Sequence, residues 1–142
     1  MSAVKSHSVL RQVEMRDLRA EVQSTSLGYR AGGAIYMYQS NITVHNSIFK
    51  NNSGMWGGAI AIKDCASALI IRCIFVGNSV FHATSKAAHG GAIVAVDTQA
   101  VQISDSEFVE NTGFSGGALL VRLRDHLSVA CVRSFHPVPA VC

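Results

Sequence analysis

The chain has 142 residues, is 49% hydrophobic and carries a formal net charge of +3. This composition excludes the low-hydrophobicity, high-charge class of disordered proteins and allows one domain with a real core. The repeated part of the chain, residues 32–121, holds four bases and five acids, so nucleic acid is not an expected partner. No apolar run reaches the roughly 18 residues of a membrane-spanning helix, and Met1–Ala20 lacks the apolar core of a signal peptide.

Residues 1–31 form the first segment and differ from the rest. Their apolar residues fall close to a helical rhythm, at Leu10, Val13, Leu18 and Val22. This spacing favours an amphipathic helical cap at the N-terminus. The alternative is a degenerate copy of a downstream unit, since Val13–Asp17 echoes Val101–Asp105.

From residue 32 onward the sequence repeats itself. The tetrapeptide Gly-Gly-Ala-Ile/Leu begins at steps of 25, 33 and 26 residues, and its four glycine pairs are Gly32 and Gly33, Gly57 and Gly58, Gly90 and Gly91, and Gly116 and Gly117. A second motif, Phe-x-x-Asn, keeps the same register, and its residues are Phe49 and Asn52, Phe75 and Asn78, and Phe108 and Asn111. A repeat of this length is typical of stacked architectures whose units share one core.

Within each unit, apolar residues alternate with polar ones, which indicates short strands rather than helices. The first strand of the units has its apolar face at Ile35 and Met37, Ile60 and Ile62, Ile93 and Ala95, and Leu119 and Val121. Three short strands per unit cannot bury their apolar faces alone, but stacked units can. We therefore predict an all-β chain, a right-handed single-stranded parallel β-helix of about four rungs, with the phenylalanines one above another and the asparagine amides bonded as a ladder.

At this point the sequence resembles the polymorphic membrane proteins of chlamydial type, which carry repeated Gly-Gly-Ala-Ile and Phe-x-x-Asn motifs. The resemblance covers roughly Ala31 to Val121. It implies a pectin-lyase-like β-helix that is exposed at the cell surface or secreted and is commonly adhesive. It implies no particular activity.

The units are expected at residues 32–56, 57–89, 90–115 and from 116–121 onward, and 122–142 are expected to form a degenerate last rung and a tail. The long step of 33 residues indicates an insertion within Ser79–His89. Two open ends and the lack of an export signal suggest a fragment of a longer protein.

The best catalytic candidates are Asp64 and Asp97, each seven residues after its first glycine. Adjacent rungs would bring their carboxylates to roughly 5 Å, where they could share a cation or act as acid and base. Gln39 and Leu123 are expected in the same column. The alternative is that both aspartates simply occupy turns. It is favoured by the sequence, because no third carboxylate or paired arginine completes this column.

Three aromatic residues, Tyr36, Tyr38 and Trp56, are the ones expected on the outside and are candidates for binding, although Trp56 could instead cover the corner beside Gly57. The histidines recur at no fixed spacing, so neither a metal nor a cofactor is expected. The cysteines are Cys65, Cys73, Cys131 and Cys142, and whether Cys65 pairs with Cys73 stays open.

These observations favour a non-enzymatic surface or extracellular module that binds a glycan or a cell-surface protein. The second hypothesis is a carbohydrate-active enzyme, a lyase, hydrolase or epimerase, that uses Asp64 and Asp97. The third is a structural spacer without activity.

Overall fold

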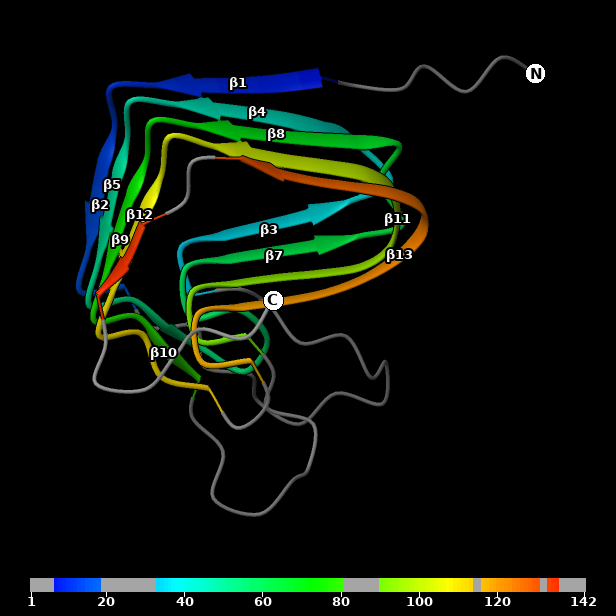
Figure 1. Ribbon diagram of the computed structural model, residues 1–142. Coiled ribbons are helices and arrows are strands. Elements are labelled where there is room, and N and C mark those ends of the chain that lie inside the picture. Colours follow the sequence, from blue (N-terminus) through cyan, green and yellow to red (C-terminus); the bar gives the residue numbers. More distant parts are fainter. Residues whose placement is uncertain (1–6, 19–32, 81–89, 114–115, 131–132, 136–142) are drawn as a thin grey trace.

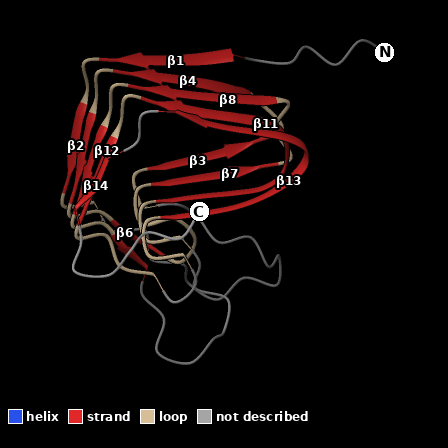
Figure 2. Cartoon of the chain, in the orientation of Figure 1, coloured by secondary structure: helices blue, strands red, loops and turns tan. Residues whose placement is uncertain are grey.

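The computed structural model describes residues 7–18, 33–80, 90–113, 116–130 and 133–135. In this part of the chain every regular element is a strand, and no helix occurs (Figure 2). All strand pairs are parallel. The chain therefore coils as a parallel β-helix, the fold class that the sequence predicts.

The strands form three sheets, which run along the axis of the coil (Figure 1). The seven-stranded sheet contains β1 (His7–Arg11), β4 (Asn41–His45), β8 (Ser67–Ile71), β11 (Ile93–Ser104), β7 (Ile60–Lys63), β3 (Ile35–Tyr38) and β13 (Leu119–Ala130). The five-stranded sheet contains β2 (Glu14–Arg16), β5 (Ile48–Lys50), β9 (Ile74–Val76), β12 (Glu107–Val109) and β14 (Arg133–Phe135). The two-stranded sheet pairs β6 (Ser53–Gly54) with β10 (Ser79–Val80).

The corners between strands use left-handed backbone conformations. Ten described residues other than glycine have positive φ angles, and they fall into three columns: Gln12, Asn46, Arg72 and Asp105; Asp17, Asn51 and Glu110; and Gln39, Asp64 and Asp97. Asparagine and aspartate tolerate this conformation better than most residues. The left-handed corner conformation therefore accounts for the asparagines and aspartates in these polar columns.

The core consists of inward residues from successive rungs. The rings of Phe49 and Phe75 stack with centroids 5.0 Å apart, and those of Phe75 and Phe108 stack at 4.8 Å. Aliphatic residues of the longer sheet, such as Ile70 and Ile103, complete the core and are fully buried. The phenylalanine column follows directly from the sequence spacing, because each Phe pairs with the Phe of the next rung.

A ladder of buried asparagines runs beside the phenylalanines. Asn52 Nδ2 donates to Asn78 Oδ1 at 3.0 Å, and Asn78 Nδ2 donates to Asn111 Oδ1 at 2.9 Å. The same Oδ1 atoms accept the backbone N–H groups of Asn52 and Asn78, each at 3.0 Å. Each amide thus bonds two rungs, which satisfies polar groups that would otherwise be buried without partners.

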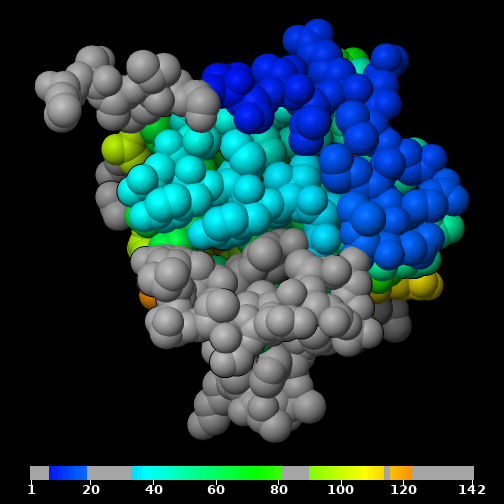
Figure 3. Space-filling model, turned by 180° about the vertical axis from the view of Figure 1, so that it is seen from behind, coloured from blue at the N-terminus to red at the C-terminus, as the bar shows by residue number. Residues whose placement is uncertain are grey.

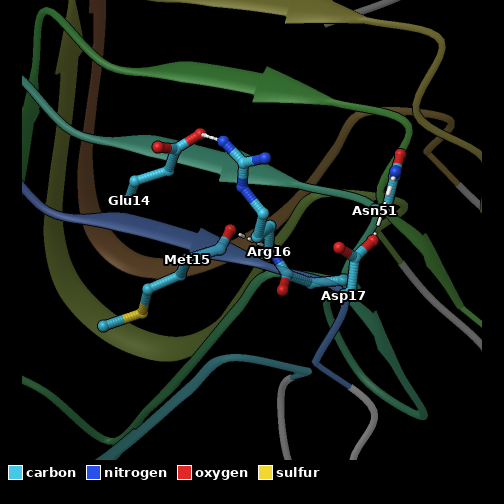
Figure 4. Close-up of polar contacts among 6 residues, drawn as sticks. Glu14, Met15, Arg16, Asp17 and Asn51 are labelled. Carbon is cyan, nitrogen blue, oxygen red and sulfur yellow. Dashed lines mark hydrogen bonds and ion pairs between the residues drawn. The ribbon is translucent and has the colours of Figure 1, made fainter.

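The N-terminal segment corrects the helical-cap prediction, because residues 7–16 contain two strands of an additional rung. β1 pairs with β4, and β2 pairs with β5 so that Met15 lies opposite Phe49. The echo between Val13–Asp17 and Val101–Asp105 gave a wrong register, since Met15 belongs to the phenylalanine column. Asn51 Nδ2 donates to Asp17 Oδ1 at 3.3 Å, next to the exposed ion pair of Glu14 and Arg16 (Figure 4).

Two further sequence predictions fall partly outside the described residues. Ser79 and Val80 belong to the stack as β10, so the expected insertion corresponds to residues 81–89, which the structure does not describe. Cys131 and Cys142 also lie outside it. In the last rung, β14 places Ser134 rather than Phe135 opposite Phe108, so the aromatic column is not continued there.

Candidate functional site

One outer face of the stack carries most of the candidate residues. It is formed by β3, β7, the first half of β11 and β13, which pair in that order. On β3, the side chains of Tyr36 and Tyr38 alternate with partly buried neighbours and are 36% and 43% exposed. The second rung, in cyan, is visible at the surface beside the blue first rung (Figure 3). Both tyrosines are therefore accessible on the outside, on a strand that ends the sheet among the described residues.

Trp56 differs from the tyrosines because it is half-buried. It packs against a small apolar cluster on the outside of the coil, made by Ala61, Val94 and Val96, and Leu120 packs on the same cluster. The indole therefore packs on the outer face of β7 and β11. Its large contact with the protein's own side chains makes it a poor candidate for a ligand platform.

The candidate carboxylates occupy one corner of successive rungs. The N–H of Gln39 donates to the carbonyl oxygen of Lys63, and the N–H of Asp64 donates to that of Val96, both at 3.1 Å. Gln39, Asp64 and Asp97 all have φ angles near +52°. Neighbouring rungs are about 4.8 Å apart, so the carboxylates come from adjacent positions of one column. Their left-handed backbone is itself a sufficient structural reason for aspartate.

The structure adds an arginine that the sequence analysis missed. Arg122 Nη2 lies 3.6 Å from Asp97 Oδ1, and the two side chains are 73% and 37% exposed. The pairing arises because β11 bulges at this point: Arg122 pairs with Val96 and Leu123 pairs with Thr98, so Asp97 has no opposite residue. Leu123 therefore does not continue the Asp64 column as predicted.

The charged and aromatic side chains form what we call the corner strip: Tyr38, Lys63 and Arg122, which follow one outward row that the buried Val96 interrupts between Lys63 and Arg122, and Gln39, Asp64 and Asp97, which follow the adjacent corner column. The strip contains two cations and two carboxylates. It offers hydrogen-bond donors and acceptors side by side next to an aromatic ring. Tyr36 lies two residues from Tyr38 on the same face.

Other titratable groups whose side chains the structure describes lie away from this strip. Within the described ranges, no group of three or more His, Cys, Asp or Glu residues is arranged to hold a metal ion. His7 Nε2 lies 2.9 Å from Thr43 Oγ1 on a different face. Cys65 and Cys73 are both free and buried, and burial raises the pKa of each thiol. These thiols belong to the core.

The described part of the chain contains no helix long and apolar enough to cross a membrane. The family model for the right-handed β-helix region matches residues 6–126 of the chain. Among curated proteins, the metabotropic glutamate receptor-like protein R of Dictyostelium discoideum is 26% identical over 111 residues, which are 63% of this chain and 7% of that protein. The chain thus spans a small part of that relative. No solved structure matches the chain.

Proposed function

The chain belongs to the right-handed β-helix family, and we propose that it is a non-enzymatic module that binds a glycan through Tyr36 and the corner strip. The exposed pair Tyr36 and Tyr38 is the observation that carries this proposal. Aromatic rings supply contact area at low entropic cost and are enriched at recognition surfaces. Here two such rings stand on one face of a rigid stack, beside carboxylates and cations that suit sugar hydroxyl groups.

The scaffold supports this proposal because it is organised before any ligand arrives. The strands that carry the strip are hydrogen-bonded to one another, and the inward residues of the two central strands, β7 and β11, are almost fully buried, whereas those of β3 and β13 are partly buried. A preorganised site does not have to order side chains and loops at the moment of binding. An extended, rigid row of this kind fits an extended ligand such as an oligosaccharide.

The resemblance to polymorphic membrane proteins supports a location outside the cell or at its surface, and it supports an adhesive role. We include both in the proposal. The receptor-like relative from Dictyostelium discoideum is described by its name as a receptor-like protein, which is compatible with recognition.

The test is binding of the full chain to a glycan array, followed by calorimetry with each glycan that binds. We expect the Tyr36→Ala/Tyr38→Ala variant to lose at least about tenfold in affinity, equivalent to about 1.4 kcal/mol, because two stacking surfaces are removed. Ile74→Ala is the matched control, since Ile74 is 37% exposed on the separate β9 face. Equal affinity of wild type and the double tyrosine variant would refute this site.

A second candidate function is carbohydrate turnover by Asp64 and Asp97, favoured by the ion pair of Arg122 with Asp97. Release of reducing ends or unsaturated sugars from polysaccharides would reveal it. Turnover that is abolished by Asp64→Asn and Asp97→Asn, but retained by Asp105→Asn, would replace the binding proposal with an enzymatic one.

A further inference from the structure

We infer that the corner strip selects neutral oligosaccharides over acidic ones. This inference rests on the proposed glycan-binding function and names its ligand class. It is carried by the charge arrangement of the strip, where Arg122 forms an ion pair with Asp97 and Lys63 is followed in the chain by Asp64.

The charges of the strip balance locally. Arg122 lies 3.6 Å from Asp97 in an ion pair. Lys63 directly precedes Asp64 in the chain, at the end of β7. An acidic sugar needs cations whose charge is not already compensated, as in arginine clusters that recognise carboxylates or phosphates. Here a uronate that reached either cation would also approach a carboxylate of like charge.

The accessible groups of the strip suit hydroxyl groups better. Carboxylate oxygens accept hydrogen bonds and the ammonium and guanidinium groups donate them, so adjacent sugar hydroxyls can do both. From Tyr38 to Arg122 the row crosses three rung steps, or about 14 Å. The apolar face of a sugar ring can rest on Tyr38, which is 43% exposed, while its hydroxyls meet the corner column.

The corner aspartates are therefore assigned a role in rejection as well as in binding. Specificity against a charged competitor commonly uses such repulsive elements. The same backbone conformation occurs at Asp105, with a φ of 49°, on a different corner column. Asp105 thus provides a carboxylate of similar backbone geometry away from the strip.

The experiment is calorimetry of the full chain with matched hexamers: mannose against mannuronic acid, galactose against galacturonic acid, and glucose against glucuronic acid. We expect at least one neutral hexamer to bind about tenfold or more tighter than its acidic counterpart, with an affinity that changes little as NaCl is raised. Asp64→Asn/Asp97→Asn should raise the affinity for the acidic hexamers several-fold, and Asp105→Asn should leave it unchanged.

Tighter binding of the acidic hexamers, with an affinity that falls as salt is raised, would overturn the inferred ligand class while leaving a glycan-binding function in place. An unchanged preference in the Asp64→Asn/Asp97→Asn variant would overturn the role assigned to the aspartates. If no hexamer of either class binds and the glycan array is also silent, both the inference and the proposed function fail.

Discussion

The second glycine of the Gly-Gly pair occurs in all four repeat units from Gly32 onward, and its environment differs sharply between Gly91 and Gly117. A Cβ atom at Gly91 would lie 1.9 Å from the carbonyl oxygen of Gly117 and 2.6 Å from the backbone nitrogen of Thr112. Among the residues that the structure describes, a Cβ at Gly117 would meet only Asn111 O at 3.7 Å, an ordinary contact. Neither residue has a positive φ. The alanine variants of these two positions therefore differ in packing alone.

The expected cost of Gly91→Ala follows from what must move. Overpacking of a close-packed interior costs about 1–3 kcal/mol. The rungs must also separate where Gly91 N–H donates to Gly116 O and Ala92 N–H donates to Ala118 O, and each weakened bond costs about 0.5–1.5 kcal/mol. We expect a loss of about 4 kcal/mol in the free energy of unfolding. Gly117→Ala should change it by less than about 1 kcal/mol, since the restricted unfolded chain favours alanine slightly.

Urea titrations of the wild type and both variants, followed by far-UV circular dichroism, measure this difference. The midpoint should fall strongly for Gly91→Ala and stay nearly constant for Gly117→Ala. Equal midpoints for the two variants would refute the proposed stacking of the glycine corners. The cost of placing alanine at Gly91 would then not depend on contact with Gly117 and Thr112 of the following rung.

Other predictions concern the core. Phe75→Ala should lower the free energy of unfolding by about 3–5 kcal/mol, since Phe75 is fully buried between two stacked rings. Ile74→Ala should cost much less, because Ile74 is exposed. Similar urea midpoints for the two variants would contradict the phenylalanine register. Cys73→Ser should cost less than about 1.5 kcal/mol, because serine already fills this column at Ser47 and Ser106 and donates to a backbone carbonyl there; a larger loss would argue against equivalence of the column. Burial raises the pKa of Cys73 above its ordinary value of 9.0. The folded state therefore holds this proton more tightly than the unfolded state, and the protein loses stability as pH rises past that value. In the same titrations, Cys73→Ser should lose less free energy of unfolding between pH 8 and 10 than the wild type, and an identical decline would refute this linkage.

The sequence predicted the central rungs well because their determinants are local and repeated. Each Phe-x-x-Asn motif fixes one inward ring and one inward amide, and the spacing from Phe75 to Phe108 is one full turn despite an insertion. The strands that follow the insertion keep the register of the stack. The ladder of Asn52, Asn78 and Asn111 was predictable for the same reason, since only a stack brings three such amides together.

The first rung was assigned wrongly because its motif residues are replaced. Met15 takes the place of the phenylalanine, and Leu18, whose N–H donates to Asn52 Oδ1, takes the place of the asparagine. Methionine fills an aromatic-sized space readily, but it leaves no recognisable motif. Because its strands are short and its apolar residues frequent, the segment fits a helical spacing as well as a strand spacing. Only its pairing with β4 and β5 distinguishes a rung of strands from a helical cap.

The outward positions of the residues in the candidate site were predictable from the sequence, but the contact between Arg122 and Asp97 was not, because it depends on the register between β11 and β13. Arg122 stands six residues after Gly116, at the same offset as Lys63 after Gly57 and Tyr38 after Gly32, so its outward direction could have been read from the repeat. Its contact with Asp97 could not, because the contact depends on a bulge that gives β11 one residue more than β13 at this corner. A bulge re-aims the side chains next to it. The feature that pairs the cation with the carboxylate, and on which the inferred preference for neutral sugars depends, is thus a departure from the repeat.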